Sequence, residues 1–125
     1  MIDQALAAYA RAQELDPHLK VSAESWNMLC WFGSLSGKPR EVMFACDKAV
    51  AMSGNSGNIR DTRGVARALN GDIQGAMEDF EAYLGQTYPE QRLEQLKAKR
   101  RQWVAELRKG KNPFTPEEVE ALKNE

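Results

Sequence analysis

The chain of 125 residues carries a net charge of −1, and 42% of its residues are hydrophobic and 28% are charged. This composition is ordinary for one globular domain and gives no overall attraction to nucleic acid or to an anionic membrane. No apolar run approaches the about 20 residues that span a bilayer, and the beginning of the chain lacks the basic and apolar regions of a signal peptide. We therefore expect no membrane partner.

Apolar residues recur at helical spacing along the chain, and the alternating pattern of strands is almost absent. We expect an all-α fold of about seven helices. Two helix starts are especially clear, because Ser22 is a plausible N-cap and Thr115-Pro116-Glu117-Glu118 combines a cap, a first-turn proline and a glutamate. In chain order the expected helices are about 5–15, 22–33, 39–50, 58–70, 73–86, 89–109 and 115–122.

The two cysteines, Cys30 and Cys46, lie in apolar helical patterns. We expect both to be reduced residues of the core. Thiols of this kind favour a cytoplasmic location, because disulfides persist mainly in oxidising compartments.

The sequence offers little for catalysis. The only histidine, His18, follows Pro17 in an expected turn, so no Cys–His nucleophile pair is indicated. No cysteine and histidine cluster has metal-ligand spacing. The loop at 54–57 follows a helix and lacks the Lys-Ser/Thr pair of a phosphate-binding loop. We expect no enzymatic activity, no cofactor and no bound metal.

An internal repeat of about 34 residues appears when residues 26–30 are aligned with residues 60–64. Residues 42–49 and 76–83 then fall into register without a gap. Residues 5–17 fit the second half of the same unit.

On these residues the chain resembles the tetratricopeptide repeat family, over about two and a half units at roughly residues 3–89. The positions that align with the family pattern are Trp26, Leu29, Cys30, Gly33, Val42, Cys46 and Ala49, then Gly64, Ala76, Phe80, Tyr83 and Tyr88-Pro89, and in the partial unit Ala5, Tyr9, Ala12 and Pro17. The chain departs from the pattern where Gly33 replaces an aromatic residue and Gly54 replaces the proline. Arginines at 60, 63 and 67 also occupy usual core or half-core positions.

The resemblance implies a right-handed stack of antiparallel helix-turn-helix units, with the first helix of each unit lining a concave face. Gly64 and Ala76 would allow close approach at a helix crossing. We expect a repeat domain at 1–111 that includes a capping helix at 89–109, and a short helical extension at 112–125. Because the chain begins in mid-unit, it is either a piece of a longer protein, which we favour, or its first helix is a cap.

The resemblance also implies a partner-binding groove on the concave face. Carried over to this chain, its residues are Glu24, Asn27, Trp31, Ser34 and Leu35, followed by Asn58, Asp61, Val65, Ala68 and Leu69. Trp31 is either an interface anchor or a core residue. Asn27 and Asp61 either bond a peptide backbone or are solvated. The Lys and Asn with which some family members grip a terminal carboxylate are missing.

Arg60, Arg63 and Arg67 share one face of an expected helix. One reading is a patch that binds an acidic ligand. The other, which we favour, is an internal network with Asp79 or with neighbouring carboxylates at 61, 72, 78 and 81.

We expect the protein to be an interaction module that binds a protein or peptide partner. One alternative is self-association through the N-terminal helix and the Met43-Phe44 surface, giving a homo-oligomer. The other is weak binding of nucleic acid through the basic residues at 97–111, although a solvated outer face is the favoured reading of that helix.

Overall fold

The computed structural model describes residues 4, 8, 11, 21–85 and 92–123, and the all-α prediction is confirmed for them. Six helices are present in these residues: α2 (Ala23–Leu35), α3 (Met43–Met52), α4 (Gly57–Leu69), α5 (Ile73–Leu84), α6 (Arg92–Arg108) and α7 (Pro116–Leu122). The count is six rather than about seven, because only residues 8 and 11 of the expected first helix are described, and both are helical. No helix in the described ranges is long and apolar enough to cross a membrane.

The helix starts follow from side-chain caps. The hydroxyl of Ser22 accepts a hydrogen bond from the Ser25 backbone N–H at 3.1 Å, and the Thr115 hydroxyl accepts one from the Glu118 N–H at 3.2 Å. Both caps were predicted. Asp72 caps α5 in the same way, because its carboxylate accepts a hydrogen bond from the Gly75 N–H at 3.0 Å. These bonds satisfy donors that the first helical turn leaves without a partner.

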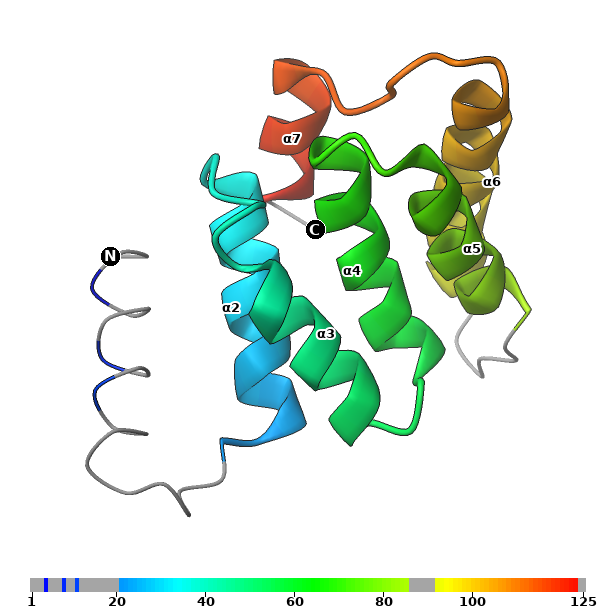
Figure 1. Cartoon of the computed structure of the whole chain (residues 1–125). Helices are drawn as coiled ribbons and strands as arrows, with labels where there is room; N and C mark the ends of the chain where they lie inside the picture. The colour runs from blue at the N-terminus through cyan, green and yellow to red at the C-terminus, as the bar shows by residue number, and fades with distance from the viewer. Residues whose placement is uncertain (1–3, 5–7, 9–10, 12–20, 86–91, 124–125) are drawn as a thin grey trace.

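The helices pack as two antiparallel pairs followed by two further helices (Figure 1). α2 packs against α3, and α4 packs against α5. Both helices of the first pair contact α4, while α6 packs on α5. Trp26, Val42 and Ala49 lie in the buried cluster of the first pair. Phe80 and Trp103 lie in a second buried cluster, which extends from α2 through α4, α5 and α6 to α7.

Gly64 lies at the crossing of α4 and α5, as expected. A Cβ atom at this position would lie 2.7 Å from Cε1 of Phe80 and 3.2 Å from Cβ of Asp79. Any larger residue would push the helices apart, since packed helices approach to about 8–10 Å only where the crossing side chains are small. Ala76 of α5 is fully buried in the same cluster as Phe80.

Cys30 of α2 and Cys46 of α3 form a disulfide bond, so the prediction that both are reduced is wrong. Both are buried, as their apolar surroundings indicated. Helical periodicity placed each of them in the core, but it could not show that they face each other between α2 and α3. The argument for a cytoplasmic location is lost with the thiols, because disulfides persist mainly in oxidising compartments.

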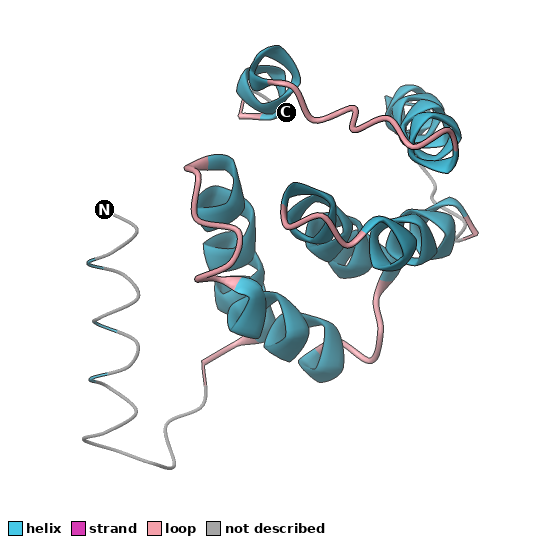
Figure 2. Cartoon of the chain, turned by 45° about the horizontal axis from the view of Figure 1, so that its top comes forward, coloured by secondary structure: helices cyan, strands magenta, loops and turns pink. Residues whose placement is uncertain are grey.

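After α6 the chain returns over α2 and α4. Figure 2 shows α6 and α7 on the same side of the other helices, joined by the linker at 109–115. α7 contacts α2, and Phe114 and Leu122 enter the buried cluster that contains Phe80 and Trp103. The C-terminal segment is therefore part of the packed core and covers one end of the surface that α2 and α4 share.

Candidate partner-binding groove

A groove of about 420 Å³ opens between α2, α4 and α6. Its lining residues are Asn27, Met28, Trp31, Phe32, Asp61, Thr62 and Arg100. Three of the residues predicted to face a partner, Asn27, Trp31 and Asp61, are thus brought together in one place. The first helices of the two packed pairs supply all three.

The apolar side of the groove is unusually open. Met28 is 58% exposed and Phe32 is 47% exposed, and both lie beside the half-buried Trp31. Trp31 also packs against the buried cluster of α4, α5, α6 and α7. One part of the Trp31 side chain therefore packs on the core, and another part lines the groove.

Asp61 is an internal ion-pair partner and not a solvated groove residue. Its carboxylate accepts hydrogen bonds from Nε of Arg100 at 3.0 Å and from Nη2 at 2.9 Å. The side chains of Asp61 and Arg100 are 8% and 3% exposed. The guanidinium group also lies 4.6 Å from the centroid of the Trp103 ring. The prediction that Asp61 bonds a partner backbone or stays solvated is corrected by this pairing.

Arg100 was not predicted as a groove residue, although its position in the sequence indicates that it is buried. It lies four residues after Leu96 and three before Trp103, so it falls on the apolar stripe of its helix. An arginine on a buried face requires a carboxylate partner. Its membership of a run of basic residues favoured a solvated reading instead.

Asn27 offers the groove an acceptor. Its amide oxygen Oδ1 is buried and has no hydrogen-bond partner within the described part of the chain. Buried acceptors are normally satisfied, so an unpaired one in a groove lining is suited to an N–H donor of a bound segment.

Several other predicted groove residues are closed off. Ser34, Leu35, Val65 and Ala68 are buried, and Leu69 packs against the same cluster. In this structure Leu35, Val65 and Ala68 are not open to a partner, because they lie in the buried cluster that Phe114 and Leu122 of the C-terminal segment complete. Glu24 and Asn58 are exposed near the starts of α2 and α4, outside the residues that line the groove.

The arginine stripe of α4 forms an internal network, the reading that we favoured. Arg60, Arg63 and Arg67 all bind the carboxylate of Asp79, at 2.9, 2.9 and 3.1 Å. Asp79 is completely buried, and Arg63 also reaches Asp47 at 3.3 Å. Burial lowers the pKa of Arg63, but hydrogen bonds and charge from Asp79 and Asp47 more than offset this, so the net shift in pKa is upward. The guanidinium groups are therefore engaged with protein carboxylates.

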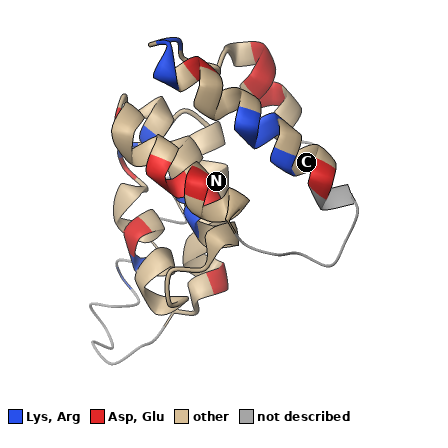
Figure 3. Ribbon diagram, turned by 90° about the vertical axis from the view of Figure 1, so that its right-hand side faces the viewer, with Lys and Arg blue, Asp and Glu red and all other residues tan. Residues whose placement is uncertain are grey.

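Several basic residues of α6 also form ion pairs within the chain. Lys99 pairs with Glu118, Arg101 with Glu94, and Arg108 with Glu81. Figure 3 shows acidic and basic segments mixed over the helices, and not one basic face. This arrangement gives little support to phosphate binding through residues 97–111.

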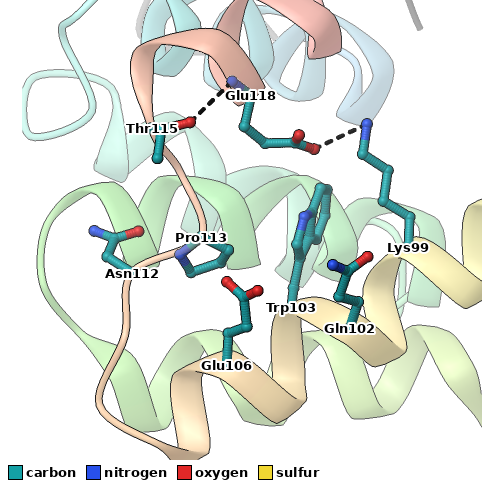
Figure 4. A pocket seen from close by; sticks show the side chains of 8 residues that line it. All are labelled: Lys99, Gln102, Trp103, Glu106, Asn112, Pro113, Thr115 and Glu118. Carbon is teal, nitrogen blue, oxygen red and sulfur yellow. Dashed lines mark hydrogen bonds and ion pairs between the residues drawn. The ribbon is translucent and has the colours of Figure 1, made fainter.

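A smaller cavity of about 290 Å³ lies where α6 meets the linker and α7. Lys99, Trp103 and Glu118 are among its lining residues. Figure 4 shows the Glu118 carboxylate directed at the Lys99 amine, with Trp103 beside them and Pro113 across the cavity. The cavity marks the seam between the C-terminal segment and the rest of the molecule.

No family model, curated protein or solved structure matches this chain. In the described ranges, no group of three or more His, Cys, Asp or Glu side chains is placed to hold a metal ion.

Proposed function

We propose that the protein is a non-enzymatic interaction module that binds a segment of another protein in the groove between α2, α4 and α6. The observation that carries this proposal is the exposed apolar pair Met28 and Phe32 beside Trp31 in an open groove. Aromatic residues and methionine are enriched in protein interfaces, and methionine adapts to different partner shapes. The unpaired oxygen of Asn27 adds one directional contact.

The proposal includes a tetratricopeptide-like arrangement, in which α2–α3 and α4–α5 are two units of a right-handed stack. Two observations support it: the close approach at Gly64, and the packing of both helices of the first pair against α4. In such a stack the first helices, here α2 and α4, line the concave face, and they line the groove.

A groove of this size takes a few side chains of a partner segment, whether that segment is helical or extended. Binding is compatible with a cytoplasmic or an oxidising compartment, since no cysteine lies among the lining residues.

Two exposed methionines provide a matched test. Met28 in the groove is 58% exposed, and Met52 at the end of α3, outside the groove, is 50% exposed. The whole 125-residue chain is used to capture partners, which are identified by mass spectrometry, and the affinity of each is measured by calorimetry. Met28→Asp should weaken binding by about tenfold or more, because a charge would be desolvated in the interface. Met52→Asp should bind as the wild type does.

Circular dichroism verifies that both variants remain helical. If Met28→Asp and Met52→Asp bind the captured partner equally well, the groove is not the binding site.

Self-association is a second candidate function, favoured by the exposed apolar Phe44 and Met52 of α3. Phe44 also packs edge-on against Trp26, with ring centroids 5.7 Å apart. The expected contribution of the N-terminal helix falls mainly on residues outside the described ranges. Sedimentation at several concentrations tests this alternative, and a strict monomer would exclude it.

A further inference from the structure

The C-terminal segment at 112–122 lies on the rest of the molecule in the way that a bound peptide lies on its receptor. Two of its side chains are anchors, because Phe114 is 7% exposed and Leu122 is completely buried. The ring centroid of Phe114 lies 4.8 Å from that of Trp103. Val119 packs against the same cluster. α7 contains only 7 residues, too few for an isolated helix in water, so its helical form depends on the surface beneath it.

One ion pair orients this segment. The Glu118 carboxylate lies 2.9 Å from the Lys99 amine, and the two side chains are 25% and 30% exposed. Figure 4 shows this pair and the Thr115 cap at the start of α7. The surface therefore favours a helix whose first turn is acidic, because Lys99 of α6 faces that turn.

The link to α6 allows the segment to leave. Backbone hydrogen bonds of the linker are local, such as those from Gly110 to Leu107 and from Lys111 to Glu106. Gly110 has a φ of 78°, a conformation that glycine adopts without strain. Release of α7 would therefore break the apolar contacts and the ion pair, and it would leave the packing of α6 on α5 in place.

The surface under α7 continues into the open groove. Trp31 lines the groove and also packs against the cluster that contains Phe114 and Leu122. Leu35, Val65 and Ala68, which the sequence pattern assigned to the partner-binding face, lie in that cluster. The open groove and the covered surface are two parts of one face.

We propose that residues 112–122 are an occupant in cis of the partner site, and that the partner is an amphipathic helix that displaces them. The chemistry of the occupant defines the partner: an aromatic residue just before the helix, an acidic first turn opposite Lys99, and a leucine one turn later. This inference rests on the proposed function and names its partner class and its regulation. A free helix of this kind meets a site that is already filled. Its apparent affinity therefore becomes weaker as the fraction of molecules with α7 docked becomes larger.

The test uses the whole 125-residue chain and a fluorescent peptide with the sequence of residues 112–123. The double variant Phe114→Ala/Leu122→Ala weakens the docked segment without removing it. Fluorescence anisotropy should show the peptide binding this variant at least about tenfold more tightly than the wild type, because the site is free more often. A peptide that carries the same two alanines is the control and should bind neither protein. Equal binding of the intact peptide to both proteins would overturn the inference.

A milder variant keeps the test valid if the double variant fails to fold. Glu118→Lys leaves both anchors in place and sets two like charges against each other at Lys99. The wild-type peptide should bind this variant about threefold more tightly than it binds the unmodified chain, the range expected for a partly exposed ion pair. When Lys99→Glu is added to the Glu118→Lys protein, the site carries an acidic residue at position 99. A peptide with lysine at position 118 should then bind better than the wild-type peptide.

Two results would separate this inference from the proposed function. A loss of partner binding in Met28→Asp, together with no peptide binding to either released variant, would support the groove and refute displacement of α7. A stable wild-type dimer in sedimentation that the peptide cannot dissociate would identify a second copy of the chain as the occupant, which also contradicts the inference.

Discussion

Arg100 of α6 reaches Asp61 of α4 at 2.9 Å, and both side chains are almost completely buried. α6 packs its backbone on α5, so this pair is a direct link from α6 to α4. Both residues also line the groove, together with Trp31. The pair therefore couples the position of α6 to the shape of the proposed binding face.

Removing one partner of this pair should destabilise the protein strongly. Asp61→Asn removes the carboxylate that lies 2.9 Å from the buried guanidinium of Arg100, and breaking a buried ion pair in this way costs about 3–5 kcal/mol. Urea denaturation followed by circular dichroism measures the change in free energy of unfolding. The control is Arg101→Ala, whose exposed pair with Glu94 at 3.9 Å should contribute about 0–1 kcal/mol. If both variants unfold at the same urea concentration, the pair is not buried as described.

The double variant Asp61→Leu/Arg100→Met separates two contributions to the loss of stability. One is the lost attraction between the two side chains, and the other is the cost of a buried charge whose partner carboxylate is removed. Replacing a buried ion pair by apolar residues of similar volume is often close to neutral, so this variant should be clearly more stable than Asp61→Asn. A double variant that is as unstable as the single one would show that the geometry of the pair is itself required.

The helical elements could be predicted from sequence because each depends on local information. Apolar spacing located α2, α4 and α5 to within a few residues, and the caps at Ser22 and Thr115 are present as predicted. Residues 39–42 form turns, and α3 begins only at Met43, later than Pro39 suggested. The close approach at Gly64 was also foreseen, because a repeat places a small residue at each crossing.

The rest of the site depends on which element covers which face, and periodicity does not carry that information. The pattern identified Leu35 and Val65 as residues of one surface, but it could not show that Leu122 would join them in one buried cluster. The pairing of Arg100 with Asp61 joins residues 39 positions apart. Asn27 and Trp31, which the resemblance to the repeat family implied as groove positions, both line the open groove in the described part of the chain.

Gly64→Ala should destabilise the protein even though alanine is the better helix former. The new methyl group would lie 2.7 Å from Cε1 of Phe80, and overpacking of this kind typically costs about 1–3 kcal/mol. Alanine gains only about 1 kcal/mol in helix propensity. Thermal unfolding measures the net change in stability, which is the cost of overpacking minus the gain in helix propensity.

A substitution of Phe80, which lies across the helix crossing from Gly64, provides the control. In the double variant Gly64→Ala/Phe80→Leu the smaller side chain makes room, so the cost of the alanine should fall relative to its cost in the wild type. Additive effects would mean that Gly64 and Phe80 do not meet.

Asp79 should be the least replaceable carboxylate of the arginine network. Asp79→Asn removes the charge that Arg60, Arg63 and Arg67 share, at a site with no exposure, and should cost about 3–5 kcal/mol. Asp47→Asn is the matched control, because Asp47 is 56% exposed and should contribute about 0–1 kcal/mol. Equal urea midpoints for the two variants would contradict the central position of Asp79.

The contribution of this arginine network to the free energy of unfolding should persist at alkaline pH. Because the folded-state pKa of Arg63 is raised, its stabilising charge is complete below the unfolded-state pKa and is lost only as pH rises through the higher folded-state value. Both values lie far above pH 10, so between about pH 7 and 10 this arginine should contribute no change in the free energy of unfolding. Arg63→Lys, which replaces two hydrogen bonds to Asp79 and one to Asp47 by one point charge, should bring a loss of stability at alkaline pH that the wild type lacks. Urea titrations at both pH values provide the comparison.

The disulfide between Cys30 and Cys46 should stabilise the first helix pair. It joins positions 16 residues apart, and closing a loop of that length restricts the unfolded chain by about 3 kcal/mol in the chain-entropy model. Reduction with dithiothreitol should therefore lower the urea midpoint of the wild type. The double variant Cys30→Ala/Cys46→Ala should start near that lower value and should not respond to the reductant. Since Cys30 and Cys46 are buried between α2 and α3, reduction should also proceed slowly until the pair opens. A wild type whose midpoint is the same with and without reductant would show that the bond adds nothing to the fold.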